Sequence, residues 1–269
     1  MPAELNLTRH GSTLVLTLND PDSRNALSPT VYAAATAALD DAARDPSLRA
    51  LVLTGAGGHF SGGGNLNQLA AVRGQPVVQA ARVDALHGWI AAMRAHPLPV
   101  IAAVEGAAAG AGCSLALACD LLVASTTARF GLAYGRIGAS PDGGAVQALM
   151  QWLPRQQALE WLWLAQVRSG AELQRSGLVN RLTDPGQALD EALALAASLA
   201  QFAPNVIASV KRLSADAAVL PLATHLDRER DAFIANLNHD NGGEGLAAWR
   251  EKRPPQFHSS ADPTGPEPT

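Results

Sequence analysis

The chain has 269 residues, a formal net charge of −4 at pH 7 and a hydrophobic content of 48%. This length and apolar content fit one large domain, or one domain with an appendage, whose core needs no disulfide framework. The slightly acidic balance, without any run of basic residues, argues against nucleic acid or an anionic membrane as a partner.

The two cysteines, Cys113 and Cys119, lie in apolar surroundings and lack the spacing of a metal site. We expect both to be buried thiols, and we expect no metal. The first residues show no basic stretch followed by an apolar one, and no apolar run is long enough to span a bilayer. The expectation is a soluble cytoplasmic protein without membrane association.

Apolar β-type runs alternate with helical patterns through most of the chain. Ser28 is expected to cap a helix that has Pro29 at its first position. Strands are predicted over residues 13–18, 50–54, 100–104, 121–124 and 178–182, with a short extended piece over 128–133. Further helices are predicted over residues 65–71, 77–94, 110–117, 145–152 and 155–166. This recurrence indicates parallel β/α units.

From residue 186 to about residue 253 the pattern is almost wholly helical, with breaks predicted at Pro204, Pro221 and residues 241–243. This block would form a separate helical layer or an oligomer interface. We divide the chain into a core over residues 1–200, a helical region over 201–257 and a tail over 258–269. The Pro, Ser, Asp and Gly content of the tail predicts disorder.

Two glycine-rich loops, residues 55–66 and 104–115, each follow an apolar strand and lead into a helical pattern. Such runs are more often simple turns. Neither loop is a nucleotide fingerprint, because no lysine stands in or beside them and Gly110-Ala-Gly112 lacks the third dinucleotide glycine. If the two loops converge, however, their bare backbone N–H groups would form a two-donor site for a developing oxyanion.

Several short motifs occur in the order and at about the spacings of a known family. They are Arg24-Asn-Ala-Leu27, Leu51-Val-Leu-Thr-Gly55, Phe60-Ser-Gly-Gly-Gly-Asn-Leu66, Pro99-Val-Ile-Ala-Ala-Val-Glu-Gly106, Gly110-Ala-Gly-Cys113, Ala118-Cys-Asp120, Phe130-Gly131 and Glu244-Gly-Leu-Ala-Ala-Trp-Arg-Glu-Lys-Arg253. In these motifs the chain resembles the crotonase (enoyl-CoA hydratase/isomerase) superfamily over about residues 5–257.

The resemblance implies an α/β fold, a crotonase-type spiral of β/β/α repeats followed by a C-terminal helical trimerisation region. It implies a homotrimer or hexamer, and an acyl-coenzyme A thioester as substrate, with no metal or redox cofactor. The family's two oxyanion-hole amides fall on Gly62 and Ala111. The substrate-binding positions that we carry over are Arg24, Ala26, Gly64, Asn65, Leu66, Ala109, Ser114, Tyr134 and Lys252.

The chain departs from a typical hydratase of this family at both catalytic glutamates, which fall on Ser114 and Tyr134. Neither side chain replaces a carboxylate pair at its ordinary pKa. One carboxylate remains, Asp142 in Ser140-Pro-Asp-Gly-Gly144. Pro-Asp-Gly is also an ordinary turn sequence, but some family isomerases that resemble this segment use an aspartate here as the proton shuttle.

The sequence therefore favours an acyl-CoA isomerase that shifts a double bond or rearranges a ring through an enolate, with Asp142 as the acid and base. One alternative is a hydratase, hydrolase or dehalogenase on the same fold. Another is an acyl-CoA-binding protein that has lost catalysis. For Tyr134, we expect a pocket-lining role. His59 is expected to be a surface loop residue, and His96 to end a helix.

Overall fold

Six strands form the main sheet of the structure, a computed structural model that describes residues 4–258. Their order is β1-β2-β3-β4-β6-β9. β1 runs antiparallel to β2, and the other neighbouring pairs are parallel, which confirms the predicted parallel β/α units. The strands are β1 (Glu4–His10), β2 (Thr13–Asn19), β3 (Ala50–Gly55), β4 (Val100–Val104), β6 (Leu121–Ser125) and β9 (Arg181–Thr183).

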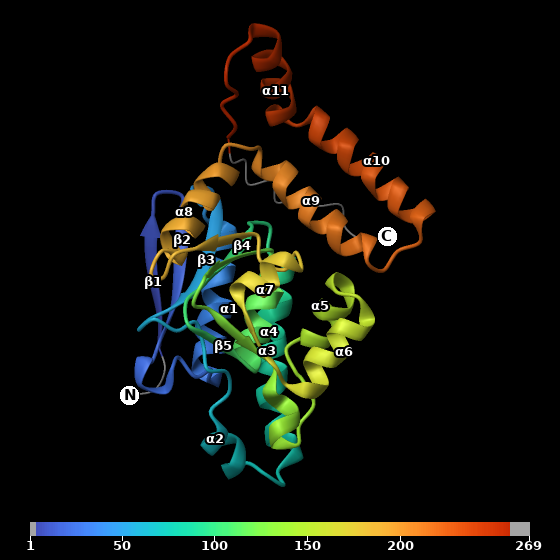
Figure 1. The fold of residues 1–269 in the computed structure, drawn as a ribbon. Helices are drawn as coiled ribbons and strands as arrows, with labels where there is room; N and C mark the ends of the chain where they lie inside the picture. Colours follow the sequence, from blue (N-terminus) through green and yellow to red (C-terminus); the bar gives the residue numbers. More distant parts are fainter. Residues whose placement is uncertain (1–3, 259–269) are drawn as a thin grey trace.

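The parallel strands are buried on both faces, because helices cover both sides of the sheet (Figure 1). On β3, Leu51 and Leu53 belong to the larger apolar cluster, which includes α1 (Pro29–Arg44) and α3 (Pro76–Ala95). Ala50 and Val52 face the smaller cluster, which α8 (Ala188–Leu199) completes. Burial on both faces explains why these strands read as nearly continuous apolar runs.

A second, three-stranded sheet has the order β5-β7-β8 and lies beside the glycine loops. Its strands are β5 (Ala107–Ala109), β7 (Arg129–Gly131) and β8 (Val167–Ser169). The remaining elements of this part are α2 (Leu66–Ala71), α4 (Ala111–Ala118), α5 (Ala145–Trp152), α6 (Arg155–Leu164), α7 (Gly170–Arg175) and the short 3₁₀ helices η1 (Pro21–Ser23) and η2 (Ala133–Ile137). All residues of α4 are buried, which makes it the central helix of the core.

The last three helices are α9 (Pro204–Ala217), α10 (Leu222–Asn238) and α11 (Asp240–Glu251). Figure 1 shows α10 and α11 projecting from the rest of the chain. Lys211 fixes α9 to the core, because its Nζ lies 2.6 Å from Asp120 Oδ2 and donates to the carbonyls of Met93 and Leu98 at 2.9 and 3.2 Å. Among the described helices, none alone is long and apolar enough to cross a bilayer; α8 and α9 meet the criterion only together, across a 108° bend.

Most predicted elements are confirmed within a residue or two, and Ser28 caps α1 as expected by accepting from the Val31 N–H. The break predicted at residues 241–243 occurs slightly earlier, at His239, because α10 ends at Asn238 and α11 begins at Asp240. The strand predicted over 178–182 begins only at Arg181. The pattern missed β1, β5, β8 and α7. Of the predicted disordered tail, residues 259–269 lie outside the described residues.

Candidate active site

Asn25 lies well before the first glycine loop in the sequence, but its side chain makes hydrogen bonds to the backbone of that loop. Its side chain is buried, and its Nδ2 donates to the carbonyls of Ala56 and His59 at 2.9 and 2.8 Å. Its Oδ1 accepts the Asp20 N–H at 2.9 Å. One amide side chain thus satisfies backbone groups that the loop leaves unpaired, and the loop is held in one conformation.

The two glycine loops converge, as the oxyanion hypothesis requires. The Ser61 N–H donates to Ala107 O, and the Ala109 N–H donates to Ser61 O, both at 2.9 Å. A Cβ placed on Gly63 would lie 2.4 Å from Ala109 O, and one on Gly112 would lie 2.7 Å from Ser61 Cβ. Glycine is needed at both positions because only bare backbone permits this approach.

The free amides at this junction are not quite the predicted pair. The Gly62 N–H donates to Arg24 O at 2.6 Å, and the Gly63 N–H donates to Ser61 Oγ at 3.1 Å. Within residues 4–258, the backbone N–H groups of Gly64 and Ala111 have no acceptor. The Ala111 nitrogen lies 3.2 Å from where a Gly63 Cβ would stand, and Gly64 is the next peptide. Gly64 and Ala111 therefore offer two unengaged donors at this junction.

Two hydroxyl groups lie between Asp142 and this junction. The Tyr134 hydroxyl donates to Asp142 Oδ1 at 2.6 Å and lies 3.2 Å from Ser114 Oγ. Ser114 Oγ also lies 3.3 Å from Gly110 O, so its single proton goes either to the phenol oxygen or to this carbonyl. Gly110 precedes Ala111, so Asp142 and the two side chains at the positions of the family glutamates, Ser114 and Tyr134, lie together beside the candidate oxyanion donors.

The aspartate turn is also held through its backbone. The Gly143 N–H donates to His87 Nε2 at 3.2 Å, so this nitrogen is unprotonated when the bond forms. A Cβ on Gly143 would lie 2.8 Å from Ser114 Cβ, which brings the turn against α4. His87 lies on α3 and is not among the residues predicted for the site from the sequence.

The charge of Asp142 is felt by both tyrosines of the chain. Burial, and then the neighbouring Asp142 carboxylate, raise the pKa of Tyr134 far above its ordinary value. The same two causes raise the pKa of Tyr32 to about 12, while Arg82 opposes the shift. Both phenols therefore remain protonated at working pH and can donate hydrogen bonds. Tyr32, on α1, is another neighbour that the sequence analysis missed.

The other predicted site residues differ in exposure and in the contacts that they make. Arg24 and Leu66 have exposed side chains, Ala26 is partly buried, and Asn65 is the N-cap of α2, accepting the Asn67 and Gln68 N–H groups. Lys252 is the C-cap of α11, one of the projecting helices (Figure 1), and among residues 4–258 its side chain makes no hydrogen bond or ion pair with another predicted site residue. His59 is not merely a surface residue, since its Nδ1 accepts the Ala107 N–H at 3.1 Å. His96 ends α3 as expected and is buried.

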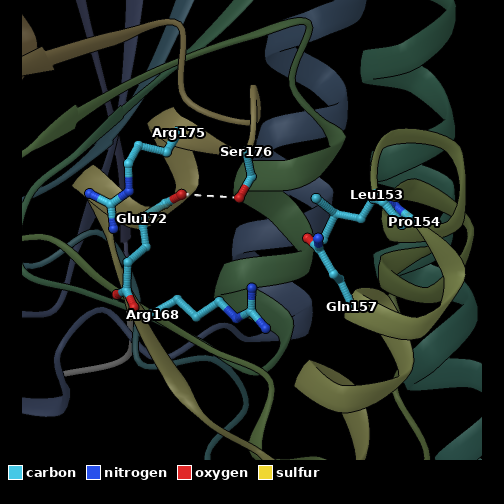
Figure 2. Close-up of a pocket in the computed structure, with 7 residues that line it drawn as sticks. All are labelled: Leu153, Pro154, Gln157, Arg168, Glu172, Arg175 and Ser176. Atoms are coloured by element: carbon cyan, nitrogen blue, oxygen red, sulfur yellow. Dashed lines mark hydrogen bonds between the residues drawn. The ribbon is translucent and has the colours of Figure 1, made fainter.

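A cavity of about 390 Å³ lies elsewhere, between the α5–α6 connection, β8 and α7. Figure 2 shows Arg168 and Glu172 among its lining residues. It shares no residue with the predicted site. Among residues 4–258, no group of three or more His, Cys, Asp or Glu side chains is arranged to hold a metal.

The sequence model of a family described as Enoyl-CoA hydratase/isomerase matches residues 8–260. The chain belongs to the enoyl-CoA hydratase/isomerase family. A crystal structure of an enoyl-CoA hydratase from Polaromonas sp. JS666 matches it with a TM-score of 0.93 and 49% identity, covering 94% of this chain and 99% of that one. The predicted family and the crotonase-type α/β fold are both confirmed.

Sequence similarity to relatives extends over nearly the whole chain. The 2,3-dehydroadipyl-CoA hydratase of Escherichia coli (strain K12) is 32% identical over 255 residues, or 95% of this chain and 98% of that protein. Enoyl-CoA hydratase EchA19 of Mycobacterium tuberculosis (strain ATCC 25618 / H37Rv) is 31% identical over 258 residues, or 93% and 95%. Their names say hydratase, whereas the sequence analysis favoured an isomerase.

Proposed function

We propose that this family member is an acyl-CoA isomerase that moves a double bond, or rearranges a ring, through a thioester enolate. Asp142 removes a proton from one carbon of the acyl group and returns it to another, so the substrate gains and loses nothing overall. The backbone N–H groups of Gly64 and Ala111 donate to the thioester oxygen while it carries the enolate charge. Each such donor contributes about 3 kcal/mol in a comparable oxyanion site.

The position of Asp142 is the main support for this proposal. It is a carboxylate that accepts from the Tyr134 hydroxyl, which lies 3.2 Å from Ser114 Oγ, and Ser114 Oγ lies 3.3 Å from the carbonyl oxygen of Gly110, the residue before Ala111. Glu105, which follows β4, is engaged elsewhere, because its Oε1 accepts the Gly186 and Ala188 N–H groups at 3.0 Å. A single carboxylate suffices for a proton shift between carbons, whereas the addition of water usually needs a second group to activate the water.

A hydratase is the second candidate, and the names of the relatives favour it. In that case Asp142 would have to activate water as well as handle the proton at carbon. Ser114 and Tyr134 do not offer a second carboxylate, so the two functions differ in their chemical outcome. An isomerase product keeps the mass of its substrate, and a hydratase product gains one water.

Mass spectrometry of unsaturated and aryl acyl-CoAs incubated in D₂O, with a parallel series in H₂¹⁸O, separates these outcomes. Deuterium at carbon without added oxygen, lost in Asp142→Asn, is the result expected for the isomerase. Incorporated ¹⁸O would establish the hydratase instead. Exchange that survives in Asp142→Asn would remove Asp142 from its role. Binding without exchange or added oxygen would favour an acyl-CoA-binding protein without catalysis.

We also infer a homotrimer or hexamer, formed through α9, α10 and α11. Large apolar side chains are exposed on these helices: Val206, Val210, Leu222, Leu226, Phe233, Ile234, Leu237, Leu246 and Trp249. So much exposed apolar surface is typical of an interface. Light scattering coupled to size-exclusion chromatography should give three or six times the 27.9 kDa chain mass. A monomer at micromolar concentration would contradict this inference.

A further inference from the structure

Tyr134 makes the shortest side-chain contact to the proposed proton shuttle. Its hydroxyl lies 2.6 Å from Asp142 Oδ1, and its ring Cζ lies 4.0 Å from where a Cβ on Gly110 would stand. The ring is therefore held between the aspartate turn and the loop that carries Ala111. The sequence analysis expected Tyr134 to line a pocket, but the structure directs its hydroxyl to a carboxylate.

The direction of this hydrogen bond is fixed by chemistry. Burial and the Asp142 charge raise the pKa of Tyr134, so the phenol keeps its proton and is the donor. A donor of this kind favours the ionised carboxylate over the neutral acid. Ser114 Oγ lies 3.2 Å from the phenol oxygen on the other side, and Ser114 itself is buried.

We propose that Tyr134 is a positioning residue that occupies one carboxylate oxygen of Asp142 and leaves the other oxygen for the substrate proton. Ser114, whose Oγ lies 3.2 Å from the phenol oxygen, helps to hold the phenol in place. This inference rests on the proposed role of Asp142 as the shuttle. It makes Ser114 and Tyr134 parts of a one-carboxylate site, in place of the two carboxylates that water activation would use.

Other ionisable groups face the same turn and must be separated from Tyr134 in any test. His87, on α3, accepts the Gly143 N–H. Tyr32, on α1, lies within electrostatic range of Asp142 and of Arg82, which itself donates to Gln68. No hydrogen bond of the Tyr32 hydroxyl is found within the described residues. Because the chain has only two tyrosines, Tyr32→Phe is the matched control for Tyr134→Phe.

The decisive experiment measures the kinetics of deuterium exchange for the whole protein, the Tyr134→Phe variant and the Tyr32→Phe variant. In Tyr134→Phe, kcat should fall about tenfold while KM changes less than about twofold, because the carboxylate is less well oriented without the phenol donor. Tyr32→Phe should change kcat by less than about twofold. An unchanged kcat in Tyr134→Phe, or an equal loss in both variants, would overturn the proposal.

A second readout does not depend on activity. The carboxyl ¹³C resonance of Asp142, assigned as the one missing in Asp142→Asn, can be recorded by NMR at a fixed neutral pH without substrate. Its chemical shift should change in Tyr134→Phe, and by less in Ser114→Ala, because the carboxylate loses its hydrogen-bond donor only in the first variant. If exchange survives in Asp142→Asn, the proposed function fails, but this resonance still decides whether Tyr134 holds the carboxylate. An unchanged chemical shift in a folded Tyr134→Phe protein would refute the contact.

Discussion

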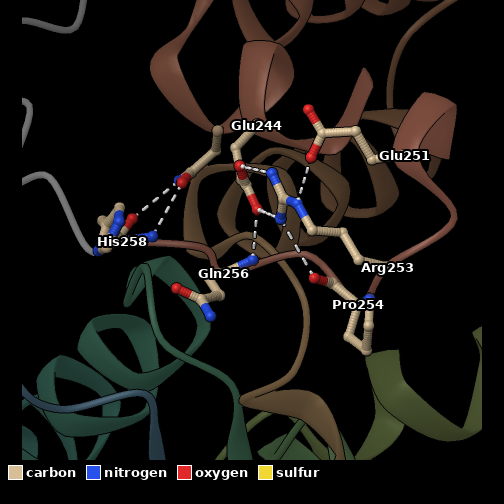
Figure 3. Close-up of polar contacts among 7 residues, drawn as sticks. Glu244, Glu251, Arg253, Pro254, Gln256 and His258 are labelled. Atoms are coloured by element: carbon tan, nitrogen blue, oxygen red, sulfur yellow. Dashed lines mark hydrogen bonds and ion pairs between the residues drawn. The ribbon is translucent and has the colours of Figure 1, made fainter. Parts of the chain in front are cut away.

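Asp142 and Glu244 are both carboxylates with short hydrogen bonds, but their partners differ in charge. Asp142 accepts from a neutral phenol, and among residues 4–258 it has no ion-pair partner. Glu244, on α11, accepts from both Nη atoms of Arg253 at 2.6 and 2.9 Å and from the Gln256 N–H at 2.7 Å (Figure 3). Hydrogen bonding from Arg253 is the largest cause that lowers the pKa of Glu244 to about 2.

The difference teaches which carboxylate can do chemistry. The Arg253 guanidinium donates to both carboxylate oxygens of Glu244 and stabilises their negative charge. Protonation of Glu244 would therefore break this pair of hydrogen bonds. Glu244 therefore serves to tie the end of α11 to the segment that follows it. The phenol at Asp142 holds one oxygen without adding a positive charge, which leaves a carboxylate that can both accept and return a proton.

The largest effect should come from removing the two carboxylates one at a time. Asp142→Asn is expected to lower the rate of deuterium exchange at carbon by about 100-fold or more, because the shuttle loses its base. Glu244→Gln should change that rate by less than about twofold. Both rates come from the same mass-spectrometric assay. Equal losses in the two variants would mean that Asp142, too, acts through structure alone.

A second variant changes the junction of the two glycine loops rather than the carboxylate. Gly63 has φ of +84°, and an added Cβ would meet Ala109 O at 2.4 Å. We expect Gly63→Ala to reduce the free energy of unfolding by about 2 to 4 kcal/mol and to abolish exchange. Gly88→Ala, where an added Cβ meets nothing within 4 Å on α3, should instead be neutral or stabilising by up to about 1 kcal/mol. Chemical denaturation compares the two, and an equally stable Gly63→Ala protein would contradict the crowded junction.

A smaller effect is expected at His87, which holds the aspartate turn through the Gly143 N–H. His87→Ala should lower kcat about threefold to tenfold, because the turn loses an acceptor and the carboxylate is less well placed. His87→Gln, whose amide oxygen can still accept, should recover most of the rate. Steady-state kinetics on both variants tests this, and a His87→Gln protein as slow as His87→Ala would argue against the acceptor role.

The smallest effect concerns stability against pH at Glu244. Because its pKa in the folded protein is lowered from 4.5 to about 2, its contribution is fully present above pH 4.5 and disappears as the pH falls to about 2. The difference in Tm between the unmodified chain and Glu244→Gln should therefore shrink across this window. Scanning calorimetry at several pH values measures it. A constant difference from pH 7 to pH 2 would show that the ion pair with Arg253 does not form in solution.

The helices and strands could be predicted from the sequence more completely than the hydrogen bonds within the candidate site. Ser28 and Pro29 fixed the start of α1, and the apolar runs fixed β2, β3, β4 and β6, because those signals are local. The glycine loops could be recognised as a candidate oxyanion site from their lack of side chains. In contrast, the engagement of the Gly62 N–H by Arg24 depends on left-handed backbone at Arg24 and Asn25, with φ of +56° and +57°. Asparagine adopts this conformation more readily than most residues, but nothing in the sequence marks Arg24 for it.

Long-range packing decided the other points that the sequence left open. Asp142 could be named from its motif, but its contact with Tyr134 depends on the path of the chain between η2, which holds Tyr134, and the aspartate turn. The glycines near residue 242 suggested a break, yet a Cβ on Gly242 would lie 2.5 Å from the carbonyls of Asn236 and Leu237. Here glycine permits close packing of α11 against α10 rather than ending a helix.

The strand order β1-β2-β3-β4-β6-β9 has a consequence for synthesis of the protein. In this sheet the spatial order of the strands is the same as their order in the sequence. Each newly synthesised strand can therefore pair with the strand made before it, at the free edge of the sheet, and no strand has to insert between two others. Both glycine loops and Asp142 have emerged well before Lys211, which later fixes α9 over Asp120. We therefore expect the site to be assembled on the nascent chain while the projecting helices are still being made.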